Sequence, residues 1–226
     1  MKPFRLLSFL LLLPLAFAAR AESGLPTLEK ISRTATISLG HRESSVPFSY
    51  YDGQRQVVGY SHDLMLAVVE RIRRELKLPA LAVKLVPVTS QNRIPLVQNG
   101  SVDLECGSTT HNRERARQAA FSVSIFLTSS RLLTRHGSGI QELADLQGRR
   151  VAVTAGTTSE RSLLLHSEST GIRFDILKVK DHGDGFNSVQ DGRAAAFLMD
   201  EAMLYGLRAK DGRPGDWRVV GQPMAA

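Results

Sequence analysis

The fold of this 226-residue chain is most visible in Glu105-Cys106-Gly107-Ser108-Thr109-Thr110-His111-Asn112-Arg113-Glu114-Arg115, which Phe121-Ser122 follows six residues later. The stretch predicts the end of a strand, a turn of small hydroxyl residues and an arginine at fixed reach. Hydroxyls, backbone N–H groups and a guanidinium that converge on one point bind a carboxylate, because the guanidinium fork matches its two oxygens. Ser108, Thr110 and Arg115 therefore indicate capture of a small anion rather than its conversion.

The first 21 residues have the pattern of a secretory signal peptide. Two basic residues precede an apolar run from 6 to 17, and small residues allow cleavage near Ala18 or Ala21. The apolar run is shorter than the ~20 residues that a membrane span needs, and an uncleaved anchor is the alternative. We therefore expect residues 1–21 to be removed and the mature chain to be periplasmic.

Charge and cysteine content limit the classes of partner. Loss of Lys2, Arg5 and Arg20 with the signal would leave 26 basic against 22 acidic residues, so the net charge falls from +7 to +4. The positive charges are scattered, without the basic stripe and interleaved aromatics of a nucleic-acid-binding protein. Cys106 is the only cysteine. It is either a small apolar residue in a strand or one whose partner lies in a C-terminal region beyond this sequence.

Strands alternate with helices along the whole chain, which predicts an α/β fold with a largely parallel sheet. A second unit with the same rhythm begins near residue 131. The helix caps that we expect are Ser61, Ser90 and Thr157, the last with Glu160 in a capping box. Strands are predicted at 34–39, 83–88, 102–106, 150–154, 174–179 and 195–199, and helices at 61–76, 90–98, 143–146, 157–160 onward, 187–191 and 201–208.

Catalytic motifs are absent from the sequence. It contains no nucleophile elbow of the Gly-x-Ser-x-Gly type, no His-Glu-x-x-His zinc motif and no paired-cysteine spacing. The Gly-x4-Gly-Lys phosphate loop is also missing, and the six histidines are dispersed. We therefore predict no metal and no cofactor.

Anion-binding groups instead recur just after predicted strands. Gly156-Thr157-Thr158 opens a helix, whose N-terminus favours negative charge. Arg42, Ser90 and Arg93 follow other strands, and Asp200 ends one and could pair with an ammonium. Taken singly, the helix start is explained as an ordinary N-cap, and each arginine as a solvated charge on the protein surface. Their shared place beyond strand ends favours a ligand site, because that edge of α/β sheets is where ligands bind.

These residues resemble the amino-acid-binding class of periplasmic solute-binding proteins of ABC transporters, solute-binding protein family 3, and within it the proteins that bind glutamate and aspartate. The resemblance runs from about Ser38 to Pro223. It rests on the opening stretch and on four further motifs: 40–50, 89–96, 180–184 and 192–200. It implies a monomer with two lobes and the ligand in the cleft between them. Closure on L-glutamate or L-aspartate would precede contact with a membrane permease.

The resemblance also implies roles for single residues. Arg115 would hold the ligand's α-carboxylate, helped by Ser108, Thr110 and the helix start at Thr157 and Thr158. Asp200 would pair with the α-ammonium. The residues placed around the side-chain carboxylate are Arg42, Ser90, Arg93 and His182. This agrees with the residues themselves, since an acidic amino acid carries two carboxylates and needs cations in excess.

Members of the family continue well past the point where this sequence stops. We therefore expect residues 22–128 to form a first lobe that lacks its C-terminal part, and residues 129–226 to form a second lobe and the start of the return crossing. A non-functional fragment is one alternative. Another is an exported enzyme on the same fold, resembling cyclohexadienyl dehydratase, with Glu43 as its general acid. A third alternative, the sensor lobe of a receptor, would need a transmembrane helix and a signalling domain, and the sequence predicts neither.

Overall fold

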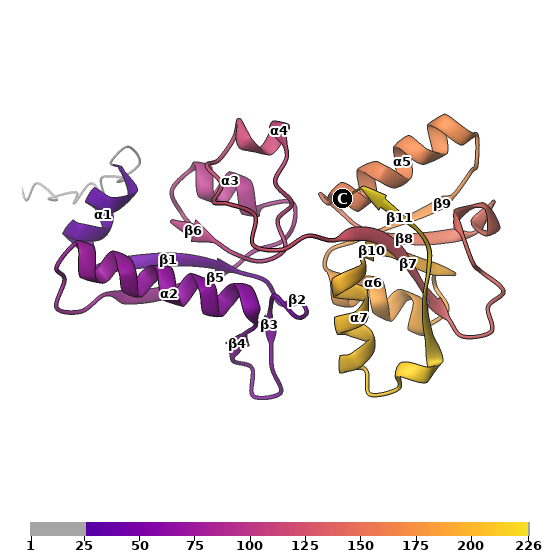
Figure 1. The fold of residues 1–226 in the computed structure, drawn as a ribbon, viewed down its shortest axis with the longest axis horizontal. Helices are drawn as coiled ribbons and strands as arrows, with labels where there is room; N and C mark the ends of the chain where they lie inside the picture. Colours follow the sequence, from indigo (N-terminus) through magenta and orange to yellow (C-terminus); the bar gives the residue numbers. More distant parts are fainter. Residues whose placement is uncertain (1–25, 226) are drawn as a thin grey trace, which may run out of the picture.

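The computed structural model describes residues 26–225, which form two α/β lobes joined by a crossing segment (Figure 1). The first lobe carries β1 to β6 and the second carries β7 to β11. The predicted signal peptide lies outside the described residues. Within 26–225, no helix has both the length and the apolar character that crossing a membrane requires.

Lobe 1 is built on a three-stranded parallel sheet in the order β5-β1-β6, with a small antiparallel sheet β2-β3-β4 beside it. Strand β1 pairs with β5 from Thr36 to His41, so both strands end at the same edge. The elements are α1 (Thr27–Thr34), β1 (Thr36–His41), β2 (Ser44–Ser45), β3 (Ser49–Tyr51), β4 (Val57–Val58), α2 (Tyr60–Glu75), β5 (Ala82–Pro87), α3 (Arg93–Gln98), β6 (Leu104–Glu105) and α4 (Arg113–Ala116).

Lobe 2 is built on a five-stranded mixed sheet in the order β11-β7-β10-β8-β9. Strands β10, β8 and β9 are parallel, whereas β7 runs antiparallel to both β10 and β11. The elements are β7 (Ser129–Arg135), η1 (Leu143–Leu146), β8 (Arg150–Thr154), α5 (Thr158–Thr170), β9 (Asp175–Val179), α6 (His182–Gln190), β10 (Ala196–Asp200), α7 (Glu201–Lys210), η2 (Pro214–Asp216) and β11 (Trp217–Ala225).

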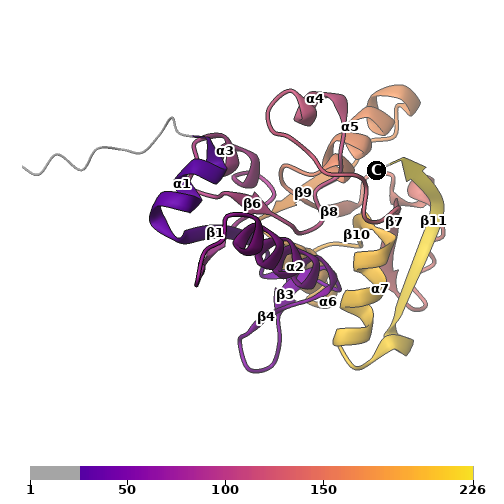
Figure 2. The same cartoon turned by 60° about the vertical axis from the view of Figure 1, so that its left-hand side comes forward.

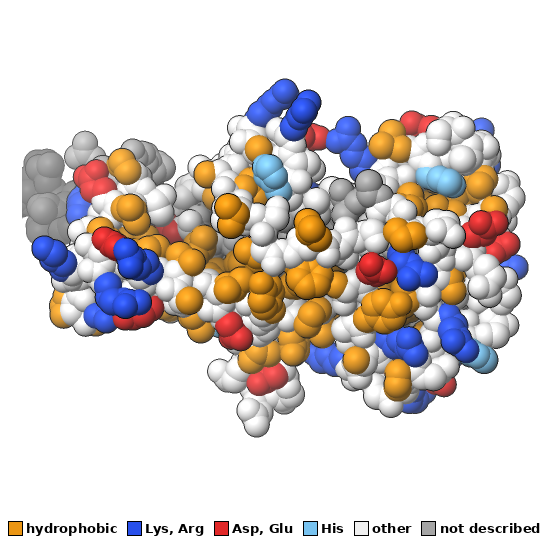
Figure 3. All heavy atoms as spheres, in the orientation of Figure 1, with side chains coloured by type: hydrophobic (Ala, Val, Ile, Leu, Met, Phe, Trp, Pro, Cys, Tyr) orange, Lys and Arg blue, Asp and Glu red, His pale blue; other side chains and the backbone are white. Residues whose placement is uncertain are grey.

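Each lobe has its own apolar core. In lobe 1, Met65 and Val69 of α2 pack on Ile37 and Leu39 of β1. Lobe 2 buries the faces of β8 and β10 under α5, α6 and α7. Val68 of α2 is 45% exposed. Tyr60 and Leu66 of α2 and Ile125 and Phe126 of the crossing segment are exposed as well, and apolar side chains gather over this part of the molecule in Figure 3.

The lobes touch through the loop between β2 and β3. Val46 and Phe48 of this loop belong to the same buried cluster as Met203 and Leu204 of α7. A Cβ on Gly206 would lie 2.7 Å from the carbonyl oxygen of Val46, so the loop and α7 approach as closely as a glycine permits. Figure 2 shows this side of the molecule, where β3 lies near α6 and α7. The strand ends of both sheets are thereby brought together.

Several predicted boundaries were wrong. Helix α2 begins one residue before Ser61, after Gly59, whose φ is +123° and whose Cβ would meet the carbonyl of Phe48 at 2.5 Å. Only glycine fits there, so it starts the helix in place of a side-chain cap. The cap of α3 is Asn92 rather than Ser90. Helix α6 starts at His182 instead of residue 187.

The expectation of a largely parallel sheet holds for lobe 1 but not for lobe 2. Strand β7 enters directly from the crossing segment, so no helix separates it from lobe 1. It pairs antiparallel with both β10 and β11, so the sheet of lobe 2 is mixed. Strand β11 and helix α1 were not predicted at all. Residues 217–225 lie at the edge of the second sheet, paired with β7.

Candidate ligand-binding site

The predicted site residues all lie just beyond the carboxyl ends of strands, as expected for ligand sites of α/β sheets. Both lobes contribute. In lobe 1, Arg42 follows β1, the pair Ser90 and Arg93 follows β5, and Ser108, Thr110 and Arg115 follow β6. In lobe 2, Thr157 and Thr158 follow β8, His182 follows β9, and Asp200 ends β10.

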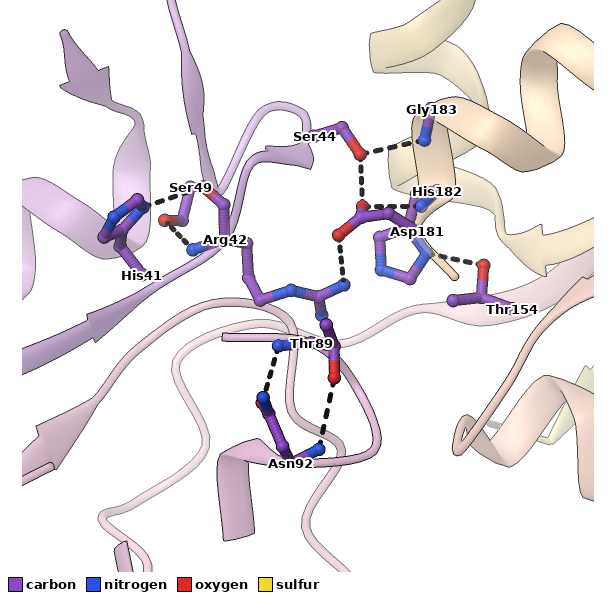
Figure 4. Close-up of polar contacts among 10 residues, drawn as sticks. All are labelled: His41, Arg42, Ser44, Ser49, Thr89, Asn92, Thr154, Asp181, His182 and Gly183. Carbon is purple, nitrogen blue, oxygen red and sulfur yellow. Dashed lines mark hydrogen bonds and ion pairs between the residues drawn. The ribbon is translucent and has the colours of Figure 1, made fainter. Parts of the chain in front are cut away.

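Arg42 is fully buried directly after β1. Its backbone N–H donates to Oγ of Ser49 at 3.0 Å, and its Nη2 donates to Oδ2 of Asp181 in lobe 2 at 3.2 Å (Figure 4). Nε and Nη1 have no hydrogen-bond partner within residues 26–225. Gly107 leaves space for the side chain, since a Cβ there would lie 2.7 Å from Cγ of Arg42. Two buried donors of Arg42 therefore remain available between the lobes.

Arg93 begins α3, and Ser90 lies in the turn before it. Both side chains are buried, and Nε and Nη1 of Arg93 and Oγ of Ser90 also lack a partner in the described part of the chain. Burial lowers the pKa of Arg93 to about 9, and the positive charge of Arg42 acts in the same direction while Glu105 opposes it. An anion placed beside Arg93 would offset this cost.

His182 is fully buried at the first position of α6. Its Nδ1 lies 2.9 Å from Oγ1 of Thr154, and its Nε2 has no partner among the described residues. Burial lowers its pKa to about 3, and the nearby Arg42 acts in the same direction, so the ring is neutral at pH 7. When the Thr154 hydroxyl donates to Nδ1, the proton lies on Nε2. His182 then offers one neutral donor between the lobes.

Arg115 links the two lobes from its half-buried position in α4. Its Nη1 donates to the carbonyl of Thr110 at 2.9 Å, and its Nη2 donates to the carbonyl of Gly156 in lobe 2 at 3.1 Å. The hydroxyls of Thr110 and Thr158 lie 3.4 Å apart across the same boundary, and Ser108 is half-buried in the preceding turn. The guanidinium of Arg115 would therefore donate to a bound carboxylate in addition to the carbonyl groups of Thr110 and Gly156.

Thr157 caps α5, as predicted, but only half of the capping box forms. Its hydroxyl accepts the N–H of Glu160 at 3.1 Å and donates to the carbonyl of Thr154 at 2.7 Å. The carboxylate of Glu160 accepts the N–H of Gly156 instead of that of Thr157. The side chain of Thr157 is thus engaged within its own lobe, and the helix start can offer a ligand backbone N–H groups and the hydroxyl of Thr158.

Asp200 is 3% exposed, and its Oδ1 accepts a hydrogen bond from Oγ of Ser130 at 3.1 Å. Burial raises the pKa of Asp200, although the Ser130 hydrogen bond and the charges of Arg93 and Arg115 oppose the rise. A cation beside the carboxylate would relieve this penalty. The site therefore provides a place for positive charge next to its cluster of arginines.

Two acidic residues of this region were not predicted. Asp181 accepts from Arg42, and Glu105 accepts from Oγ1 of Thr109 at 2.7 Å while its Oε1 stays buried without a partner in residues 26–225. Buried arginines require nearby negative charge, but the burial of Arg42 and Arg93 becomes visible only in the folded structure. Asp181 directly precedes His182, and Glu105 begins the stretch 105–115. Within the described residues, no group of three or more metal-ligating side chains gathers.

Two lobes that bring unpaired cationic and neutral donors together at their strand ends define the class of extracytoplasmic solute-binding proteins. The profile of the bacterial extracellular solute-binding proteins, family 3, matches residues 37–212. The chain belongs to this family.

Relatives of known name are similar over most of the chain. The "Glutamate/aspartate import solute-binding protein" of Salmonella typhimurium is 54% identical over 92% of this chain and 70% of its own length. Its namesake from Escherichia coli is 52% identical over the same shares. The "L-glutamate/L-aspartate-binding protein" of Pseudomonas aeruginosa is 52% identical over 88% of this chain and 66% of its own length. The chain thus spans about two thirds of the length of these relatives.

Solved structures share the fold. An ancestral arginine-binding protein bound to glutamine is 25% identical with a TM-score of 0.71, covering 85% of this chain and 80% of that one. The L-cysteine solute receptor of Neisseria gonorrhoeae is 21% identical with a TM-score of 0.76, covering 89% and 77%. At these identities the likeness concerns the two-lobed architecture, and the ligand must be argued from the site itself.

Proposed function

We propose that this chain captures glutamate and aspartate in the periplasm and delivers them to the membrane permease of an ABC transporter. One observation carries the proposal: six buried polar atoms of Arg42, Ser90, Arg93 and His182 lack a partner within residues 26–225. A buried donor without a partner costs about 1–3 kcal/mol, and more when it is charged. A ligand with a second carboxylate satisfies these donors, whereas an apolar side chain would leave them unpaired.

The remaining groups suit the amino-acid end of such a ligand. Arg115 and Ser108, with Thr110 and the helix start at Thr158, would hold the α-carboxylate, and Asp200 would hold the α-ammonium. The charges agree with this division, because burial raises the pKa of Asp200 and lowers that of Arg115, so each gains from an opposite charge beside it.

Binding would couple to closure of the lobes. Arg42 and Arg93 come from lobe 1, whereas His182 and Asp200 come from lobe 2, so a ligand contacts its full set of partners only when the lobes are together. A ligand shifts a conformational equilibrium by its difference in affinity for the two states. Glutamate would therefore favour the closed form, which would then present its surface to the permease. We propose that the protein acts as a monomer.

The enzymatic alternative finds little support at the position it needs. Glu43, the residue expected to act as general acid, is exposed. Its backbone carbonyl accepts the N–H of Tyr51 at 3.1 Å, which fixes the loop without turning the carboxylate inward. The named relatives above 50% identity are import and binding proteins. Binding without turnover is the function that we propose.

Isothermal titration of the purified chain with glutamate, aspartate and glutamine tests the proposal. We expect glutamate and aspartate to bind and glutamine to bind at least about tenfold more weakly, a difference of about 1.4 kcal/mol. Equal affinities for glutamate and glutamine would contradict the assignment of the arginines. Absence of binding for all three would contradict the proposed function.

A further inference from the structure

Asp181 is a lobe 2 residue whose carboxylate reaches an arginine of lobe 1. Its Oδ2 accepts from Nη2 of Arg42 at 3.2 Å, across 139 positions of sequence (Figure 4). Its Oδ1 accepts from the hydroxyl of Ser44 in lobe 1 and from the N–H of His182 at 2.6 Å. The N–H of Gly183 donates back to Oγ of Ser44 at 2.8 Å. Every contact of this carboxylate except the one to His182 therefore crosses between the lobes.

The carboxylate of Asp181 is charged. Burial alone would raise its pKa, but the positive charge of Arg42, with smaller contributions from the hydrogen bonds of the Ser44 hydroxyl and the His182 N–H, lowers it below the usual range. The Arg42 side chain is 0% exposed and that of Asp181 is 11% exposed, so water screens the pair little. The contact is a buried ion pair between the lobes.

Arg42 has no other ionic partner among residues 26–225. Of the two other acids of the region, Asp200 accepts from Ser130, and Glu105 accepts from Thr109 through Oε2 and forms no ion pair with Arg42 in the described part of the chain. Asp181 is part of the chain and accompanies Arg42 whenever the lobes are closed, whatever molecule they enclose. The guanidinium keeps Nε and Nη1 for a ligand and gives Nη2 to the protein.

We propose that Asp181 is a specificity-determining residue, an internal counter-ion that closure delivers to Arg42. This inference rests on the proposed function. A ligand without a second carboxylate does not leave Arg42 wholly unpaired, because Asp181 still neutralises it. The preference for glutamate over glutamine is therefore smaller than it would be if Arg42 and Arg93 had no counter-ion within the protein. The ion pair also favours closure of the lobes around either ligand. Asp181 sets both the selectivity and the ease of closing.

The test compares Asp181→Asn with the chain as it stands. Asparagine keeps the shape and an oxygen that accepts from His182, but it removes the charge. Without that charge, a closed complex with glutamine leaves Arg42 buried and unpaired, whereas glutamate supplies a carboxylate. Isothermal titration should show the affinity for glutamine falling more than that for glutamate, so that their ratio rises by about tenfold, at the lower end of measured couplings between close charge pairs.

Asp184→Asn is the matched control, because Asp184 is an exposed acid on the same helix and should leave both affinities unchanged. A ratio in Asp181→Asn that is unchanged or lower overturns the inference, even when the chain itself prefers glutamate. When the chain shows no preference for glutamate, the proposed function fails. The role of Asp181 as a counter-ion between the lobes is then tested by small-angle scattering of both proteins without added amino acid. A larger radius of gyration for Asp181→Asn supports the interlobe counter-ion, and an identical radius overturns it.

Discussion

Replacing Arg93 by methionine should make the protein more stable and weaken its binding of glutamate. Arg93 is 2% exposed, and two of its guanidinium nitrogens have no partner in the described residues. Methionine has a similar length and no charge, so it fills the same space without the desolvation cost. Most core substitutions destabilise a protein. A gain here would show that Arg93 is retained for its ligand.

The size of the effect follows from the pKa. Burial lowers the pKa of Arg93 from 12.5 to about 9, and each pKa unit corresponds to about 1.4 kcal/mol, so the charged form carries a cost on the order of 5 kcal/mol. Loss of the attraction between Arg93 and Glu105 returns part of it. We expect the unfolding free energy to rise by about 1–4 kcal/mol, as when buried ionic groups are replaced by apolar ones. Removing one partner of a buried charge pair should cost glutamate binding about 2–5 kcal/mol.

Urea unfolding without amino acid measures the stability, and isothermal titration with glutamate and glutamine measures the binding. Arg71→Met is the matched control, because that side chain is 71% exposed on α2, where its ion pair with Glu75 contributes little. The reasoning is refuted when Arg93→Met lowers the unfolding free energy. It is equally refuted when the affinities for glutamate and glutamine fall by the same factor, because the lost charge would then not face a second carboxylate.

Three further substitutions probe other parts of the molecule. His182→Gln should flatten the pH dependence of stability: the folded pKa is about 3 and the unfolded value 6.5, so the unfolded chain binds the extra proton and stability falls by about 1.4 kcal/mol per pH unit below 6.5. Urea unfolding at pH 7.5 and 5 should show a steeper loss in the unmodified chain, and equal slopes would count against a buried neutral His182. Asp200→Asn should lower the affinity for glutamate more than about tenfold but leave the affinity for glutarate, which lacks the ammonium, unchanged. Titrations that show equal losses of affinity would exclude pairing of Asp200 with the α-ammonium. Gly206→Ala should lower the unfolding free energy by about 1–3 kcal/mol, because its Cβ would meet the carbonyl of Val46 at 2.7 Å, whereas Gly53→Ala, with open space around it, should have little effect in thermal unfolding.

Elements with a strong local pattern could be predicted from the sequence. Strand β8 and helix η1 have the predicted bounds, since each is a short apolar segment between clear turn residues. Strand β11 could not be found in this way, because it exists through pairing with β7, about 90 residues earlier in the chain. The start of α2 depends on the close approach of Gly59 to the carbonyl of Phe48, and the identity of Ser61 as a typical cap residue carries no information about that contact.

The position of the site could be predicted, but its charge balance could not. Arg42, Arg93 and Asp200 each follow or end a strand, and a rule about sheet edges is enough to bring them together. The ion pair of Arg42 with Asp181 depends on how one lobe lies against the other, which no local pattern encodes. Nothing in the sequence distinguishes a buried arginine from a solvated one without that information.

The unpaired donors explain why the site lies between two lobes instead of inside one. A single lobe that buried Arg42 and Arg93 permanently would pay their desolvation cost in every molecule, bound or unbound. When the lobes can separate, opening returns part of that cost in the unbound protein, and closure buries the arginines fully only together with carboxylates, one from Asp181 and others from a ligand. Selectivity for a dicarboxylate and dependence on closure are then the same property. A substitution that stabilises the closed site by removing charge, such as Arg93→Met, must reduce both.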